Sequence, residues 1–252
     1  MLELKRDEIL LLFDIDNTLT LPRDVIDPEF EKFLYEKIKP LAKIAIVTGA
    51  DLPKIYEQMN GEKILKEFDY IFPENGIVHI ENDVEVQKSS FSEKLGEEIL
   101  TSFIDFSLRY IADLKLPFKR GTFLEYRNGM INIAPCGRQC TKEERKIFSD
   151  FDKKHHVRTK MIEALKEKFH DIDLTYAIGG QISFDIYPKG WDKSFCLTRL
   201  PCDKFKEIHF FGDQTKLGGN DHEIYEHELT IGHHVDSYKD TERILSEMFK
   251  LK

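Results

Sequence analysis

The stretch LLLFDIDNTLT, residues 10–20, joins a short apolar run to two carboxylates that are one residue apart. An apolar run of this length, bounded by polar residues, predicts a fully buried strand. Asp14 and Asp16 follow at the point where this strand leaves the core. Aspartate is a poor strand former and costs free energy when it is buried without partners. The two residues therefore indicate either a turn, whose chemistry Asp and Asn favour, or a polar site at the end of a strand.

The composition indicates a globular protein. Its 252 residues are 41% hydrophobic, enough for one large domain or two small ones. The net charge of -9 argues against nucleic acid or an anionic membrane as a partner. We expect no membrane span, because no apolar run approaches the roughly 18 residues that a span needs. We expect no signal peptide, because charged residues lie too close to the N-terminus. The four cysteines show neither zinc-site nor redox spacing, so we expect a reducing, cytoplasmic location.

Strands and helices alternate from residue 9 to about 75, and a similar pattern returns near the C-terminus. Such alternation implies right-handed crossovers and a parallel sheet, hence an α/β domain. Asp27-Pro28 marks one helix start, with proline at the first helical position. We expect a core formed by residues 1–85 and 190–252, with an inserted domain between them. Its further strands are expected at 43–47, 70–72 and 207–211, and its further helices at about 51–60 and 240–249.

Residues 86–189 have a different pattern, which predicts an inserted α+β cap with an antiparallel sheet. Asn128-Gly129 between apolar-polar alternations is a strong hairpin signal, and Gly179-Gly180 predicts the turn of a second hairpin. A single amphipathic helix is expected over about 95–114, a capping box starts another at Thr141, and a third is expected over about 157–169.

The period-2 alternation of the two hairpins separates an apolar face from a polar one. The apolar face should pack against the helices. The polar face is either an ordinary solvated surface or a binding surface, and its hydrogen-bonding residue types favour binding. The apolar set is Leu124, Tyr126, Ile131, Ile133, Ile182, Phe184 and Ile186, and the polar set is Glu125, Arg127, Asn132, Gln181, Ser183 and Asp185.

In open α/β sheets, ligands bind outside the carboxyl ends of the strands. Here those ends carry Asp14 with Asp16, then Thr48, then Asp213 with Asp221 beyond it, while Lys193 follows the insertion. This order of motifs resembles that of the haloacid dehalogenase-like superfamily. Over nearly the whole chain the sequence resembles the eukaryotic-type phosphomannomutases. The segments that carry this resemblance are LFDIDNTLTLPR, FLEYRNGMINIAPCGRQCTKEER, GGQISFDIYPKGWDK and FFGDQTKLGGNDHEIY.

The resemblance implies roles for the core residues. Asp14 would be the nucleophile that becomes an aspartyl phosphate, and Asp16 would be the general acid and base. Lys193 would neutralise charge, and Thr48 would bind a phosphoryl oxygen. Phosphate among carboxylates requires a hard cation, and Mg²⁺ suits oxygen ligands. The implied metal residues are Asp14, Asp16 through its carbonyl, Asp213, Asn220 and Asp221, and those of a second cation site are Tyr225, His227 and Thr230.

The resemblance also implies a substrate site, because the planar forks of arginine bind phosphate oxygens in bidentate fashion. Its residues would be Arg23 in the core and Arg127, Arg138, Arg145, Ser183 and Asp185 in the cap. Three places depart from the usual motifs. Residues 47–51 read VTGAD where SGGSD or VGGSD is common, so the role of Thr48 is implied by the superfamily. Asn17 stands where glycine is usual, and we expect it to adopt a positive φ. His227 replaces an oxygen ligand, which weakens the expectation of a second cation.

The implied activity is the interconversion of mannose 6-phosphate and mannose 1-phosphate through a hexose 1,6-bisphosphate, which would supply GDP-mannose synthesis. Glucose phosphates are further candidate substrates, and glucose or mannose 1,6-bisphosphate is the expected activator. A homodimer through the cap is also implied. Two alternatives stay open: a sugar-phosphate phosphatase, and a non-catalytic sugar-phosphate-binding protein. The pairs His155-His156 and His233-His234 are expected to be solvated rather than metal ligands.

Overall fold

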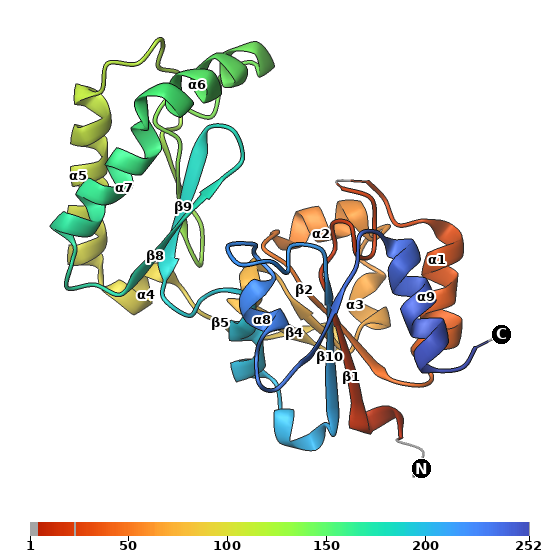
Figure 1. Cartoon of the computed structure of the whole chain (residues 1–252). Helices are drawn as coiled ribbons and strands as arrows, with labels where there is room; N and C mark the ends of the chain where they lie inside the picture. Colours follow the sequence, from red (N-terminus) through yellow and green to blue (C-terminus); the bar gives the residue numbers. More distant parts are fainter. Residues whose placement is uncertain (1–4, 23, 252) are drawn as a thin grey trace. The chain divides into compact units, whose positions relative to one another are not determined.

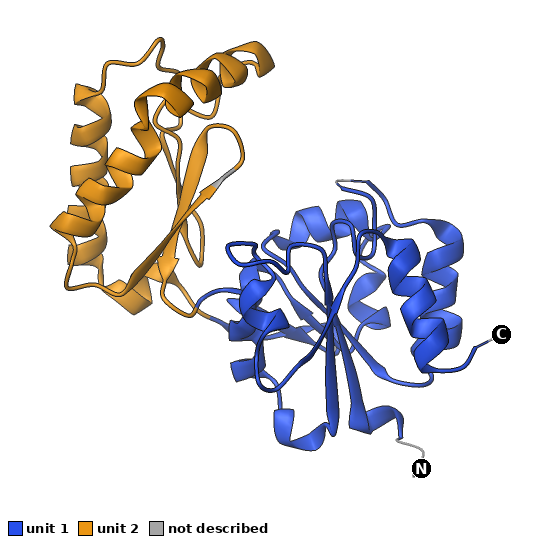
Figure 2. Cartoon of the chain, viewed as in Figure 1, with its two compact units in different colours: residues 1–88, 191–252 blue, residues 89–190 orange. Residues whose placement is uncertain are grey.

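A computed structural model describes residues 5–22 and 24–251 of the chain. The chain divides into two compact units, the first made of residues 1–88 and 191–252 and the second of residues 89–190 (Figure 1, Figure 2). Each unit has a sheet and a hydrophobic core of its own. Within the described part of the chain, every helix is too short or too polar to cross a bilayer.

The first unit is built on a seven-stranded sheet with β1 (Ile9–Phe13) in its interior. All five residues of β1 are buried, as the apolar run predicts. β1 pairs in parallel with β10 on one side and with β2 on the other, which confirms the predicted α/β class. The sheet order is β11 (Ile231–His234), β10 (Glu207–Gly212), β1, β2 (Lys43–Val47), β3 (Tyr70–Phe72), β4 (Val78–Glu81) and β5 (Val84–Lys88). β4 pairs antiparallel with β3 and with β5.

Hydrophobic side chains cover both faces of this sheet. Leu11 and Phe13 belong to one cluster, and Leu10 and Leu12 belong to another on the opposite face. Because a strand buried on both faces has no solvent side, its sequence reads as a continuous apolar run. The helical elements are η1 (Arg6–Glu8), α1 (Pro28–Phe33), the π-helical η2 (Leu34–Ile38), α2 (Leu52–Gln58), α3 (Ile64–Glu67), η3 (Glu74–Gly76), η4 (Lys193–Arg199), η5 (Cys202–Lys204), α8 (His222–Tyr225) and α9 (Tyr238–Met248).

The second unit has a four-stranded antiparallel sheet in the order β6 (Leu124–Tyr126), β7 (Ile131–Ile133), β9 (Ser183–Pro188) and β8 (Leu174–Gly179). Its helices are α4 (Phe91–Leu95), α5 (Glu97–Asp113), α6 (Lys142–His155) and α7 (Val157–Lys168). The hairpin at Asn128-Gly129 is confirmed, because the Arg127 amide donates to the Met130 carbonyl at 2.9 Å. Phe184 and Ile186 are buried while Ser183 and Asp185 are half-buried, as the alternation predicts.

Three local predictions were wrong. The expected single helix over 95–114 is divided at Gly96, whose φ of +85° ends α4 before α5 begins. The second hairpin does not turn at Gly179-Gly180: Gly179 pairs with Ser183, so residues 180–182 form the loop. His233 is not a solvated residue, because its Nε2 lies 2.9 Å from His209 Nδ1 and its ring stacks on Phe211.

Candidate active site

Asp14 directly follows β1, at the carboxyl end of the parallel strands. Its amide donates to the Phe211 carbonyl of β10 at 3.0 Å, so the sheet ladder fixes the backbone at this point. The Asp14 residue is only 5% exposed. A buried carboxylate requires a partner, because removing its charge from water is costly. The strand therefore places the carboxylate in the kind of position that demands a counter-ion.

Lys193 supplies that counter-ion. This residue begins η4 and is 1% exposed, and its Nζ lies 2.5 Å from Asp14 Oδ1 and 2.6 Å from Asp221 Oδ1. The other oxygen of Asp221 accepts from the Gln214 amide at 2.9 Å. Residues distant in sequence thus form one buried chain of charge-assisted hydrogen bonds, which fixes the ammonium against Asp14.

Gly212 makes room for this arrangement at the end of β10. A Cβ at position 212 would lie 2.6 Å from Asp221 Oδ2 and 2.8 Å from a ring carbon of Phe210. Any larger residue would therefore have to displace the Asp221 carboxylate or the aromatic ring. The glycine in the Gly212-Asp213 motif is required here by close approach of the side chains rather than by backbone strain.

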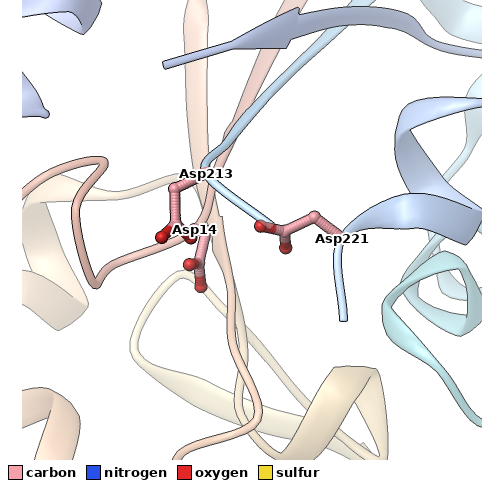
Figure 3. Close-up of side chains that lie close together, drawn as sticks. All are labelled: Asp14, Asp213 and Asp221. Atoms are coloured by element: carbon pink, nitrogen blue, oxygen red, sulfur yellow. The ribbon is translucent and has the colours of Figure 1, made fainter. Parts of the chain in front are cut away.

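Three carboxylates lie close together (Figure 3), and two of them contact Lys193. Oxygens of Asp14, Asp213 and Asp221 lie within 4.8 Å of one another, and this is the one such group of three among the described His, Cys, Asp and Glu residues. Asp213 also accepts from Asn17 Nδ2 at 2.9 Å and from Gln214 Nε2 at 2.7 Å. An all-oxygen donor set suits a hard divalent cation such as Mg²⁺. Three carboxylates outnumber the single ammonium, so the charge balance also fits a cation.

The protonation behaviour of this cluster follows from its burial. Burial raises the pKa of Asp14 to about 7, with Lys193 opposing the rise and Asp221 adding to it. Burial disfavours the charged form of Lys193, but the attraction of Asp14 and Asp221 outweighs it and raises the pKa of that ammonium. Lys193 therefore stays charged, and any further positive charge at the carboxylates favours the ionised Asp14 that a nucleophile needs.

Asp16 lies in the turn after β1, and Asn17 adopts the predicted positive φ of 58°. One oxygen of Asp16 accepts from Gln58 Nε2 at 2.7 Å. Thr48, at the end of β2, is buried, and its hydroxyl accepts from the Ala50 amide at 3.2 Å. The turn and the β2 end thus place these two polar residues at the same edge of the sheet as Asp14.

A second polar cluster occupies one row of the sheet in the second unit. Glu125, Asn132 and Asp185 are cross-strand neighbours on β6, β7 and β9. Glu125 accepts from Arg127 Nε at 2.8 Å and forms an ion pair with Arg138 Nε at 2.6 Å. Asn132 accepts from Arg138 Nη1 and donates to Asp185 Oδ1 at 2.6 Å. Residues of the predicted polar face therefore form one hydrogen-bonded network.

Arg145 joins this network from α6, since its Nη2 donates to the Arg138 carbonyl at 2.8 Å. Its three arginines outnumber Glu125 and Asp185, so the network has a net positive charge. Because the Nε atoms of Arg127 and Arg138 are held by Glu125, the two guanidinium groups have fixed orientations. Such a surface can bind an anion with several oxygens.

Comparison with known proteins agrees with this geometry. The model of the eukaryotic phosphomannomutase family matches residues 30–251 of the chain. The chain belongs to this family. It is 60% identical over 249 residues to a phosphomannomutase of Drosophila melanogaster, with 98% of each chain covered. It is 49% identical to a phosphomannomutase of Glycine max, covering 97% of this chain and 98% of that one.

Solved structures of other proteins share the fold of this phosphomannomutase family member. A trehalose-6-phosphate phosphatase related protein superposes with a TM-score of 0.56 at 15% identity, covering 96% of this chain and 97% of that one. An IMP-nucleotidase of Plasmodium falciparum gives a TM-score of 0.60 at 15% identity, covering 96% and 62%. The expected haloacid dehalogenase-like fold and the resemblance to phosphomannomutases are both confirmed.

The family resemblance named other residues that the structure places less decisively. Arg23 lies outside the described residues. Asn220 is exposed in the loop before α8. The Ser183 carbonyl accepts from Arg158 Nη1 at 3.0 Å, which orients the backbone at the start of β9. In the expected second cation site, Thr230 Oγ1 donates to the His227 carbonyl at 3.1 Å, and His227 Nδ1 accepts from the Leu229 amide at 3.2 Å. These local bonds form a turn beside Tyr225, and a second cation site stays a prediction.

Three partners of the site were not assigned a role from the sequence. Glu125 and Asn132 were placed on the polar face by alternation, and their residue types were the signal for a network. Gln58 had no such signal, because nothing in the local pattern of α2 points to a residue 42 positions earlier in the chain.

Proposed function

We propose that this member of the phosphomannomutase family interconverts mannose 6-phosphate and mannose 1-phosphate, with Asp14 carrying the phosphoryl group. The observation that supports this most strongly is the buried contact of Lys193 with Asp14, at 2.5 Å, in a cluster of three carboxylates. A carboxylate held against a lysine can accept a phosphoryl group, because the ammonium balances the charge that arrives with it.

In the proposed cycle, phosphorylated Asp14 donates its phosphoryl group to a hexose monophosphate, which gives a hexose 1,6-bisphosphate. After the sugar reverses its orientation, Asp14 takes the other phosphoryl group back. Asp16 removes a proton from the attacking hydroxyl in the first step and returns a proton to the leaving oxygen in the second. Lys193 and Thr48 hold the phosphoryl oxygens.

Asp14, the Asp16 carbonyl and Asp213 would hold Mg²⁺, with Asp221 and Asn220 beside them. When bound, the ion would supply Lewis-acid stabilisation of charge on the phosphoryl oxygens. Asp221 has a second task that its contacts support, because its oxygens accept from Lys193 and from the Gln214 amide. It would keep the Lys193 ammonium directed at Asp14.

The polar network of the second unit would hold the sugar and the phosphate that is not being transferred. Arg127, Arg138 and Arg145 would bind phosphate, and Asp185 and Ser183 would bind sugar hydroxyls. Arg23, which belongs to the first unit, would also bind phosphate. The network must accept either end of the bisphosphate, and guanidinium groups suit this task because they bind tetrahedral oxyanions by charge and planar geometry.

Five further expectations rest on the family resemblance. A hexose 1,6-bisphosphate, with glucose or mannose as the sugar, would be needed to load Asp14. The chain would form a homodimer through its second unit, which light scattering after gel filtration would test. It would act in the cytoplasm and supply GDP-mannose synthesis. Glucose phosphates would also be accepted, which a direct comparison of kcat/KM would test.

The decisive experiment incubates the protein with mannose 1-phosphate, Mg²⁺ and a trace of glucose 1,6-bisphosphate, while mannose 6-phosphate and free phosphate are measured together. Asp14→Asn should abolish both products, whereas Asp203→Asn, at an exposed position of the same unit, should leave them unchanged. Release of phosphate without mannose 6-phosphate would identify a phosphatase instead. Turnover by Asp14→Asn would show that another residue is the nucleophile.

A further inference from the structure

Asp16 is held by a side chain that the proposed chemistry does not use. Gln58 Nε2 lies 2.7 Å from Asp16 Oδ1 and 3.4 Å from Thr20 Oγ1. Asp16 and Thr20 are also joined by an isolated β-bridge across the turn between them. The amide of Gln58 therefore contacts both sides of the turn that presents the Asp16 carboxylate.

The backbone of Gln58 is fixed well enough to act as a support. Gln58 is the last residue of α2, and its carbonyl accepts from the Ile26 amide at 2.8 Å. Its neighbours Ile55 and Met59 are buried in the core of the first unit. Because these contacts fix the end of α2, the side chain of Gln58 reaches Asp16 from a rigid base.

An amide donor is well suited to hold a carboxylate. A carboxylate oxygen accepts hydrogen bonds, and the NH₂ end of a glutamine side chain donates them. A leucine at position 58 offers no donor, and an ionised glutamate repels the carboxylate.

We propose that Gln58 is a positioning residue that holds the Asp16 carboxylate in place through the hydrogen bond from its Nε2. This inference rests on the proposed role of Asp16 as general acid and base. Gln58 acts on catalysis through Asp16 and takes no part in the transfer itself. A displacement of about 1 Å in a catalytic group can lower a rate by on the order of 10²-fold, so the loss of this support should be measurable.

The test is a double-mutant cycle between Gln58→Leu and Asp16→Ala. Gln58→Leu should lower kcat by about 10- to 100-fold while KM for mannose 1-phosphate changes by less than about threefold, because positioning affects the reacting step. In the Asp16→Ala background, the same substitution should change the residual rate by less than about twofold. Gln58→Glu, which is isosteric and lacks the NH₂ donors, should lose activity as Gln58→Leu does.

Gln87→Leu is the matched control, since it makes the same chemical change at an exposed position on β5. It should leave kcat unchanged, and circular dichroism should show all variants folded. An equal effect of Gln58→Leu in the presence and absence of Asp16 would overturn the inference, as would a loss confined to KM. Full activity of Asp16→Ala would instead overturn the proposed role of Asp16, so the two failures are distinguishable.

Discussion

The two polar clusters of this protein differ in burial more than in composition. In the first unit, Lys193 is 1% exposed and Asp221 is fully buried. In the second unit, the side chains of Arg127, Arg138 and Glu125 are 26%, 32% and 35% exposed. Both clusters combine positive and negative groups. The first is shielded from water, whereas the arginines of the second are partly accessible to an anion from solution.

This difference has an energetic consequence. Removing one partner of a buried ion pair costs about 3–5 kcal/mol, because a charge is left without compensation, whereas an exposed pair contributes about 0–1 kcal/mol. The first cluster should therefore support both folding and chemistry. The second should matter for binding and little for folding. Variants in the two clusters can test this contrast directly.

The largest effect is expected for Lys193→Met. It leaves the Asp14 and Asp221 carboxylates buried without their ammonium, so the free energy of unfolding should fall by about 3–5 kcal/mol and mutase activity should be lost. Urea unfolding in the presence of EDTA measures the stability. Lys206→Met is the control, since the Lys206 side chain that pairs with Glu8 is 58% exposed, and it should lose far less stability. Equal losses in the two variants would remove the contrast between the clusters.

A smaller and different effect is expected for Arg138→Ala in the second unit. KM for mannose 1-phosphate should rise by about 10- to 100-fold, because a charge-assisted bond to phosphate contributes about 1.5–3 kcal/mol. The unfolding midpoint in urea should barely change. Arg109→Ala, at a side chain that is 80% exposed, should alter neither quantity. A fall in kcat at constant KM would place Arg138 in the chemical step instead.

The smallest effect is expected in the dependence of stability on acidic pH, and it should arise from residues of the first unit. Burial and the nearby His209 lower the pKa of His233 to about 4, and burial lowers the pKa of His209, whereas His155 and His156 of the second unit are exposed. Between pH 6.5 and 4 these two histidines bind more protons in the unfolded chain than in the folded chain, so their contribution to stability should fall as the pH is lowered, whereas the raised pKa of Asp14 contributes in the opposite direction.

His233→Gln should reduce this dependence, because glutamine can bond to His209 without titrating. The measurement is urea unfolding at pH 6.5 and pH 5, and the difference between wild type and variant should be at most about 1 kcal/mol after allowance for solvent screening. His155→Gln should leave the slope unchanged. A slope that is the same in wild type and His233→Gln would show that these histidines do not carry the acid sensitivity.

Much of the fold could be predicted because its strongest patterns are local. The apolar run before Asp14 predicted β1, Asp27-Pro28 predicted the start of α1, and Asn128-Gly129 predicted the hairpin of the second unit. β5 was missed because it is an exposed edge strand whose Val84 and Val86 have no buried partner face to reveal them. The break at Gly96 was missed because the apolar spacing continues across it.

The site was predictable only in part. Alternation alone placed Asp185 on a polar face, and that placement is confirmed by its register with Asn132. Lys193 and Asp14 lie on either side of the inserted unit in the sequence. No local pattern could therefore reveal their contact, and the family resemblance was needed. Gln58 shows the limit most clearly, because a single long-range hydrogen bond leaves no trace in the sequence of α2.

The insertion of one unit into the other has a consequence for how the molecule is made. The second unit is a continuous segment, residues 89–190, while the first needs residues on both sides of it. β1, which directly precedes Asp14, pairs with β10, which the ribosome makes only after the insertion is complete. Domains fold as their residues emerge, so the inserted unit can fold while its host still lacks a neighbour strand. In a nascent chain, Asp14 thus lacks its buried partners until Lys193, Asp213 and Asp221 have been synthesised.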